Sequence, residues 1–375
     1  MRFLPVILLA CFVLSAAAYQ RNREEFFPYP TEKLENHALV LTFAPGQLGR
    51  LAGLKLKNGG IELANEFKLS RYTETPLFHL DSGNFQGVRE LFWRRSISGI
   101  APMKCVARTP DSITFETSSY GSTDLGLRRK TTLAKESFII EIESVFTNRG
   151  KTPDKFSVWL NLQGAAPARP VIPVLAKGVV PMRGAVRLYH RPFIFTGAGG
   201  NSNLPPAEDW AGFRLPGRNT VWVMECPGLK KNGGFFYSWG NQDHRAPIRT
   251  VEPVFPEITL KNGEKSPPFR YRILVFPGLE NINALCGETA VELRRTGNGK
   301  AVLLLCSAVP VKKAEPVTLI LRDKQGKEIF RKNFTLPPGP AGNVSVFTEN
   351  LKGTADSGTV QIGTRNSSLY FEKDK

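Results

Sequence analysis

The chain has 375 residues, 41% of them hydrophobic, and a formal net charge of +17 at pH 7. This length suits one large β domain followed by a smaller one, or two or three ordinary domains. The basic residues are spread along the chain without a long block, which is typical of a solvated surface and leaves an acidic polymer as the alternative partner. With no recognisable binding motif for it, we expect no nucleic-acid partner.

The first element in the chain has the layout of an export signal. A basic start at Arg2 is followed by an apolar run over residues 3–14 and by small residues that end at Ala18. This order predicts a signal peptide over residues 1–18 and a mature protein that is periplasmic or extracellular. The run is shorter than the ~20 residues that span a bilayer, and no later stretch is apolar enough, so we expect no transmembrane segment. A lipid anchor at Cys11 is the alternative, although it would leave a very short leader.

Short runs of alternating apolar and polar residues recur along the rest of the chain, between clusters of Gly, Pro and Asn. Period-two alternation with turn residues between the runs predicts an all-β sandwich or barrel. Few windows carry apolar residues at helical spacing, so we expect almost no helix. The clearest predicted strands cover residues 112–116, 138–146, 219–224, 270–276, 301–306 and 317–322.

Two segments rich in proline or glycine interrupt this pattern, at residues 164–181 and 197–217. We predict both to be loops, because proline disfavours long regular structure and long loops in a compact domain usually shape a site. A turn near residue 278 precedes a fresh series of short strands, which suits a small immunoglobulin-like β-sandwich. The predicted domains are therefore residues 19–285 and residues 286–375.

Four cysteines remain after the predicted signal peptide: Cys105, Cys226, Cys286 and Cys306. An exported chain can form disulfides, but four cysteines allow three pairings, and buried unpaired thiols are an equal alternative. Their spacing contains no CxxC pair, so we expect no zinc site. The chain also lacks a P-loop and a GxGxxG motif that opens a helix, and we expect no cofactor.

Several short motifs recur in order between residues 38 and 280. Residues 39–54 form two apolar runs around a glycine turn, and Gly60-Ile61-Glu62-Leu63 follows as a hairpin. The long run over residues 131–146 ends in an Asn-containing turn, and residues 235–253 place Trp-Gly-Asn and Asp before Val-Glu-Pro. Together these motifs resemble the galactose mutarotase-like (aldose 1-epimerase-related) superfamily over residues 38–280. It implies a large antiparallel β-supersandwich and a carbohydrate ligand.

The resemblance also implies a pair of catalytic groups for the exchange of sugar anomers, a glutamate base and a histidine acid. Glu252 matches the glutamate. Trp159 occupies the histidine position, and an indole N–H is too weakly acidic to protonate a ring oxygen. The usual acid is therefore missing from its place, or another residue supplies it, with His190 and His79 as candidates.

The strand that carries Trp159 still has the pattern of a binding surface. Alternation places Ser157, Trp159, Asn161 and Gln163 on one face and four apolar residues on the other. An aromatic ring beside hydroxyl and amide groups suits a sugar, whose ring face is apolar and whose hydroxyls need hydrogen bonds. The alternative is a tryptophan that covers a large sheet.

Charged residues complete the predicted site. The resemblance places an arginine in its first part, and Arg94 or Arg95 could fork onto sugar hydroxyls or a carboxylate. Asp243 and His244 lie in a polar turn before the strand of Glu252 and could reach the same cleft. The alternatives are a basic edge strand for the arginines and a solvated loop for the Asp-His pair.

We therefore predict an exported carbohydrate-binding or carbohydrate-processing accessory protein on a mutarotase-like scaffold that lacks the usual acid histidine. One alternative is an active sugar epimerase or a lyase-like enzyme with Glu252 as base. Another is a structural envelope protein that binds acidic polymers through its basic surface.

Overall fold

The structure is a computed structural model that describes residues 31–64, 88–95, 102–164, 168–175, 180–182, 185–187, 192–196, 202–239, 250–296, 299–351 and 353–372. Within these ranges the chain forms strands β1 to β30 and one short 3₁₀ helix, η1 (Asn58–Gly60). The prediction of an all-β chain is confirmed. None of the helical structure in these ranges is long and apolar enough to cross a membrane. The predicted signal peptide, residues 1–18, lies outside the described residues.

The first of two nine-stranded sheets follows the order β1-β2-β3-β5-β11-β20-β19-β16, with β4 paired to β3. We call it the site sheet, because it carries the predicted site. All its described pairings are antiparallel. Its strands are β1 (Glu32–Glu35), β2 (Leu39–Ala44), β3 (Arg50–Leu56), β4 (Ile61–Glu62), β5 (Val88–Phe92), β11 (Val158–Gln163), β16 (Ser202–Leu204), β19 (Phe235–Ser238) and β20 (Thr250–Val254).

The second nine-stranded sheet, which we call the back sheet, follows the order β15-β12-β17-β18-β22-β9-β8-β7-β6 and is also antiparallel. Its strands are β6 (Lys104–Thr109), β7 (Ser112–Thr117), β8 (Leu125–Leu133), β9 (Ile139–Asn148), β12 (Arg169–Val174), β15 (Phe193–Phe195), β17 (Trp210–Leu215), β18 (Thr220–Glu225) and β22 (Phe269–Pro277). Two small two-stranded antiparallel sheets pair β10 (Asp154–Phe156) with β21 (Ile258–Leu260) and β13 (Val180–Met182) with β14 (Ala185–Arg187).

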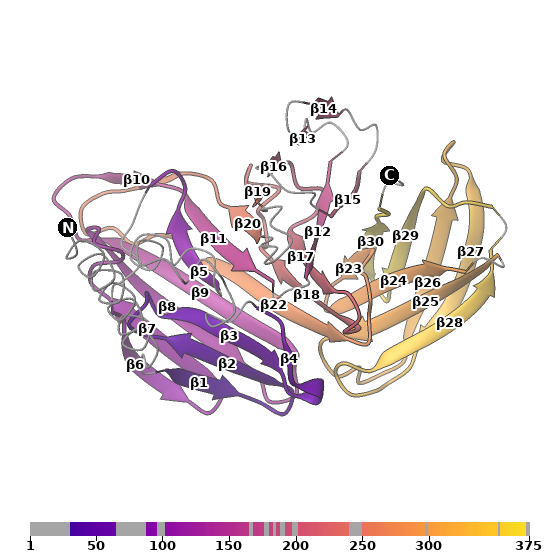
Figure 1. Ribbon diagram of the computed structural model, residues 1–375, viewed down its shortest axis with the longest axis horizontal. Coiled ribbons are helices and arrows are strands. Elements are labelled where there is room, and N and C mark those ends of the chain that lie inside the picture. The colour runs from indigo at the N-terminus through magenta and orange to yellow at the C-terminus, as the bar shows by residue number, and fades with distance from the viewer. Residues whose placement is uncertain are drawn as a thin grey trace, which may run out of the picture.

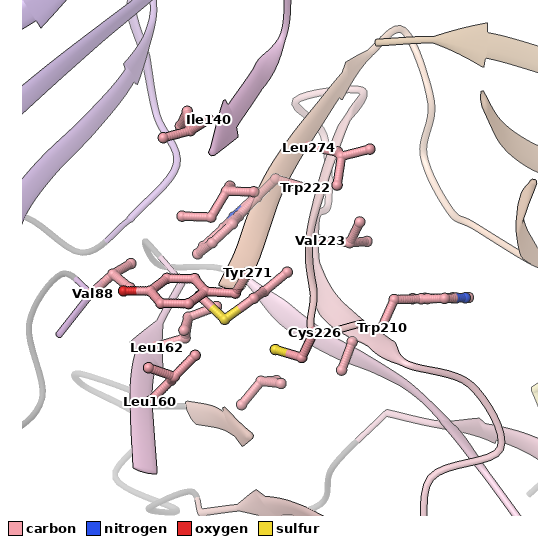
Figure 2. Close-up of a cluster of buried hydrophobic side chains, with 14 of the residues drawn as sticks. Val88, Ile140, Leu160, Leu162, Trp210, Trp222, Val223, Cys226, Tyr271 and Leu274 are labelled. Carbon is pink, nitrogen blue, oxygen red and sulfur yellow. The ribbon is translucent and has the colours of Figure 1, made fainter. Parts of the chain in front are cut away.

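The two large sheets pack face to face over one hydrophobic core. Strand β11 contributes Leu160 and Leu162 from the site sheet, and strands β18 and β22 contribute Trp222 and Tyr271 from the back sheet (Figure 2). All four side chains are fully buried. Burial of alternate apolar side chains is the main driving force for a sandwich of this kind, at about 25 cal/mol per Å² of apolar surface.

The rest of the chain forms a second, smaller sandwich, which lies beside the first (Figure 1). It has two four-stranded antiparallel sheets and a core of its own. The strand β23 spans the predicted domain boundary and pairs within this second sandwich. One sheet has β23 (Ala284–Cys286), β24 (Thr289–Arg295), β25 (Lys300–Ser307) and β28 (Val344–Asn350), and the other has β26 (Glu315–Arg322), β27 (Glu328–Leu336), β29 (Ser357–Ile362) and β30 (Arg365–Leu369).

The six clearest predicted strands all form, as β7, β9, β18, β22, β25 and β26. The two predicted loops were partly wrong, because β12 and part of β13 lie in the first and β16 and β17 in the second. Strand β12 tolerates Pro170 and Pro173 because its two halves pair with different strands. Residues 169–171 pair with β17 and residues 172–174 with β15, so several N–H positions face no partner strand.

The four cysteines are all free thiols. Cys226, Cys286 and Cys306 are buried and Cys105 is exposed. Burial raises the pKa of the Cys226 and Cys306 thiols, which makes both poor nucleophiles. The cysteines are therefore unpaired thiols and form no disulfides. The buried ones act as small apolar groups in the two cores.

A buried ion pair joins the two large sheets. Glu90 of β5 accepts hydrogen bonds from Arg129 of β8, Ser144 of β9 and Tyr271 of β22. The Arg129 Nε to Glu90 Oε1 distance is 3.0 Å and the Tyr271 hydroxyl lies 2.9 Å from the same oxygen. Burial alone would raise the pKa of Glu90, but the charge of Arg129 and these hydrogen bonds hold it below its usual value. The carboxylate is therefore a fixed charge in the core.

The substitution Glu90→Gln should lower the free energy of unfolding by about 3–5 kcal/mol, because it leaves the buried Arg129 guanidinium without its counter-ion. Glu116→Gln is the matched control, since Glu116 pairs with Arg128 on the exposed face and should change stability by about 1 kcal/mol or less. All five tryptophans belong to the first sandwich, so urea unfolding followed by tryptophan fluorescence reports on this sandwich. Equal, small effects in both variants would contradict a structural role for the pair.

Candidate functional site

Four neighbouring strands of the site sheet, β5, β11, β20 and β19, bring the candidate residues together. Across β11 and β20, Trp159 is paired with Val254 and Gln163 with Thr250. Across β19 and β20, Tyr237 is paired with Glu252. Side chains at paired positions of an antiparallel sheet lie on the same face. Trp159, Asn161, Gln163, Glu252 and Tyr237 therefore share the face that points away from the core.

The Glu252 carboxyl is held by two side chains of β11. Trp159 Nε1 donates a hydrogen bond to one carboxyl oxygen at 2.8 Å, and Asn161 Nδ2 donates to the other at 2.8 Å. Residues 159 and 161 are two positions apart, so period-two alternation gives both donors the same direction. The prediction that Trp159, Asn161 and Glu252 lie together therefore agrees with this geometry.

Glu252 is only 1% exposed. Burial raises the pKa of its carboxyl to about 8, and the hydrogen bonds from Thr250, Trp159 and Asn161 offset only part of this effect. Desolvation dominates because the donors are neutral and no described basic side chain pairs with the carboxyl. Glu252 consequently carries a proton on most molecules at neutral pH and can exchange it near that pH.

Four aromatic rings contact one another on the face that carries this carboxyl. Trp93 makes edge-to-face contacts with Trp159, Phe235 and Tyr237, at centroid distances of 5.4, 5.4 and 5.1 Å. Trp159 and Tyr237 also meet edge to face at 6.4 Å. The Trp93 backbone N–H donates to the Ser157 carbonyl, which fixes the turn after β5 against β11. We call Trp93, Trp159, Phe235 and Tyr237 the aromatic cluster, and all four rings remain partly exposed.

Two buried acceptors on the same face have no partner among the described residues. The side chains of Asn161 and Gln163 are 1% and 2% exposed, and Asn161 Oδ1 and Gln163 Oε1 make no hydrogen bond there. A buried polar atom without a hydrogen bond lowers stability by about 1–3 kcal/mol. Such atoms are therefore usually hydrogen-bonded to a ligand or a water molecule.

The predicted arginines lie in the turn after β5. Arg95 forms a two-pronged ion pair with Asp154 at 2.8 and 3.0 Å, and its guanidinium lies 5.6 Å from the Phe92 ring centroid. Arg94 is exposed, with a left-handed backbone at φ 60°. Arg95 is therefore engaged by β10, and Arg94 is the freer of the two to meet a ligand. Asp243 and His244, together with His79 and His190, lie outside the described residues.

Sequence reasoning missed the rest of the aromatic cluster. Phe235 and Tyr237 alternate along β19, directly before the segment that leads to Glu252, so their shared face was readable from the sequence. Trp93 lies one residue beyond β5 and gave no periodic signal. Among the described residues no group of three or more His, Cys, Asp or Glu side chains could hold a metal ion.

The candidate site therefore combines a buried carboxyl, two buried amides and four partly exposed aromatic rings on one sheet of a large antiparallel β-sandwich. The sequence matches no protein-family model and no curated protein.

Several solved structures are similar to this sandwich. A galactose mutarotase-like protein from Lactobacillus casei is similar with a TM-score of 0.47 and 13% identity, over 65% of this chain and 99% of that chain. A galactose mutarotase related enzyme from Lactobacillus acidophilus gives 0.45 and 9%, over 67% and 99%. A TPR-domain containing protein from Parabacteroides distasonis gives 0.50 and 14%, over 65% and 46%. The likeness is one of fold alone.

The buried carboxyl should make stability fall as pH rises. In the unfolded chain Glu252 ionises above the ordinary glutamate pKa of 4.5, whereas in the folded chain burial raises its pKa and it keeps its proton up to about 8. Between these values the folded state binds more protons, so this group costs about 1.4 kcal/mol of stability per pH unit. Glu252→Gln removes the titration, and its stability advantage over the natural protein should grow from about pH 5 to about pH 7.5.

Urea unfolding at a series of pH values measures this difference. Glu143→Gln is the matched control, because that carboxylate is exposed and pairs with the exposed Arg270. An advantage of Glu252→Gln that is absent, or constant with pH, would show that the Glu252 carboxyl is already ionised in the folded protein.

Proposed function

We propose that the protein is an exported carbohydrate-binding protein whose site is the outer face of β11, β19 and β20. The observation that supports this most directly is the Glu252 carboxyl, held by Trp159 and Asn161 at 2.8 Å each beneath the aromatic cluster. A sugar needs this combination, because its ring carbons form apolar faces while its hydroxyls need directed hydrogen bonds. The expected signal peptide would deliver this site to the periplasm or the cell exterior.

The site is built to hold a ligand in one orientation. The indole N–H and the amide of Asn161 fix the carboxyl, and the carboxyl in turn fixes the plane of the indole. The edge-to-face contacts of Trp93 then restrict the remaining rings. Such preorganisation reduces the ordering cost of binding.

Catalysis of anomer exchange is a second candidate function, favoured by the pKa of Glu252 near 8. A base is most effective when its pKa lies close to the working pH, and the ionised fraction of Glu252 could accept the anomeric proton. The acid that protonates the ring oxygen is not supplied by Trp159. Tyr237 is the hydroxyl that faces Glu252 across β19 and β20, but burial and Glu252 raise its pKa to about 12 and weaken it as an acid. We therefore place binding first.

Adhesion to acidic polymers through a basic surface receives less support. Several exposed arginines of the described surface are paired with carboxylates, as in Arg108 with Glu32, Arg128 with Glu116 and Arg270 with Glu143. Interspersed pairs of this kind do not form a continuous basic field.

Sugar binding should raise the melting temperature, and the rise should depend on the aromatic cluster. A monosaccharide at ten times its dissociation constant stabilises the protein by about 1.4 kcal/mol, which shifts the melting point by a degree or more. We expect a shift that persists at high salt and that Trp93→Ala removes. Phe347→Ala is the matched control, because it truncates a ring of the Phe334–Phe347 pair in the second sandwich. A shift with acidic polymers alone, lost at high salt, would favour adhesion instead.

The catalytic candidate makes a separate prediction. If Glu252 acts as the base, the protein should accelerate mutarotation of an aldose in a polarimeter, and the rate should rise with pH toward the Glu252 pKa of about 8 as the carboxyl ionises. Glu252→Gln should abolish this rate, because an amide cannot accept the proton. If the protein binds an aldose but accelerates the mutarotation of none, its function is binding without catalysis.

A further inference from the structure

The face around Glu252 holds two buried side-chain oxygens that no described residue supplies with a donor. The indole N–H of Trp159 and one N–H of Asn161 Nδ2 already donate to the carboxyl. The oxygens Asn161 Oδ1 and Gln163 Oε1 are buried and accept no hydrogen bond from the described residues. Asn161 and Gln163 are two residues apart on β11, so both oxygens lie on the Glu252 face. A complementary ligand must therefore bring donors.

Within the described part of the chain, the Glu252 carboxyl has no counter-ion. Its oxygens accept from neutral N–H groups and it forms no ion pair there. The other fully buried glutamate in the sandwich, Glu90, is paired with Arg129. A carboxylate removed from water is stable only when a charge is placed next to it, and otherwise it takes up a proton. A ligand with a positive charge would supply that charge.

The aromatic cluster adds a second attraction for a cation. Trp93, Trp159 and Tyr237 lie beside the carboxyl, and Tyr237 is paired with Glu252 across the strands. A ring face attracts an ammonium group that lies within about 6 Å of its centroid, and tryptophan attracts it best. The same rings provide the apolar surface on which a sugar ring rests.

We propose that this site selects an amino sugar, a sugar that carries a primary ammonium group, with the ammonium bound at Glu252. An ammonium has three N–H donors and no acceptor, which matches the carboxyl of Glu252 and the oxygens of Asn161 and Gln163. The inference rests on the carbohydrate site proposed above and names the chemical class of its ligand.

The neighbouring charges direct the ammonium toward β20. On β20 itself Thr250 contributes a hydroxyl, and on β19 Tyr237 contributes another. The buried cation Arg89 is paired with Asn161 from the β5 side. Asn161 thus separates Arg89 from Glu252, and an ammonium is repelled at the β5 end of the face and attracted at the β20 end.

Binding of the ammonium should ionise Glu252. In the free protein the pKa of about 8 keeps the carboxyl protonated on most molecules at neutral pH. An adjacent positive charge favours the carboxylate, so the proton passes to solvent when the amino sugar binds. The carbonyl infrared band of a buried protonated carboxyl then disappears, and this readout needs no variant.

Isothermal titration at neutral pH with galactosamine, N-acetylgalactosamine and galactose, and with the corresponding gluco sugars, tests the inference. The free amine should bind about tenfold more tightly than its neutral parent and its N-acetyl form, a difference of roughly 1.4 kcal/mol. Glu252→Gln should bind all three sugars with similar affinity, whereas Phe347→Ala should keep the preference. The infrared band should vanish with galactosamine and remain with galactose.

Each other outcome has a distinct meaning. Equal binding of the three sugars, or an N-acetyl form that binds as tightly as the amine, would overturn the inference and leave the carbohydrate site intact. Titration with potassium chloride that gives comparable Glu252-dependent binding would overturn it too, by assigning the position to an inorganic cation. If neither amino nor neutral sugars bind, the proposed function fails together with the inference.

Discussion

The buried ion pair between Glu90 and Arg129 fixes the site sheet against the back sheet. It is the point at which β5, one of the central strands of the site sheet, is attached by directed bonds to β8, β9 and β22. Tyr120 adds a hydrogen bond from its hydroxyl to the Glu90 carbonyl at 2.7 Å. These directed bonds add to the apolar packing that holds the two sheets face to face. Within the site sheet, β5 pairs with β11, and the chain then enters the turn that contains Trp93. Trp93, which contacts Trp159, therefore follows directly on a strand that is anchored in the core.

The second sandwich contributes to the same rigidity from the other end of the molecule (Figure 1). The chain returns from β30 to the back sheet, where Tyr370 donates a hydrogen bond to Glu208 at 2.5 Å and Glu372 forms an ion pair with Arg214 of β17. The Ile194 N–H of β15 donates to the Phe371 carbonyl. Apolar residues of β23, β24 and β25 join the first core. The two sandwiches therefore share a packed junction.

The sequence was sufficient for the local parts of this architecture and insufficient for the pairings. Alternation identified β7, β9 and β22, and it placed Trp159 and Asn161 on one face, because strand periodicity is a property of neighbouring residues. The contact between Glu90 and Arg129 joins residues 39 positions apart, and that between Trp159 and Glu252 joins residues 93 positions apart. Such contacts depend on strand order and register, which alternation does not encode. Strand β12 was missed because its prolines predict a loop, whereas its divided pairing needs fewer N–H donors.

Glu90 and Glu252, the two buried glutamates among the described residues of the first sandwich, differ in whether the chain supplies a counter-ion. Glu90 has a cation of its own chain beside it, so its charge is neutralised, its pKa is lowered and it has no remaining need for a ligand. Glu252 has the same burial but only neutral donors among the described residues, so its pKa is raised to about 8 and the carboxyl is protonated on most molecules at neutral pH. The burial of Glu252 without a counter-ion lowers the stability of the folded protein at neutral pH. The apolar core and the Glu90–Arg129 ion pair offset this loss. The raised pKa of Glu252 and the lack of a counter-ion among the described residues, both in contrast to Glu90, are the features on which the proposed ligand site rests.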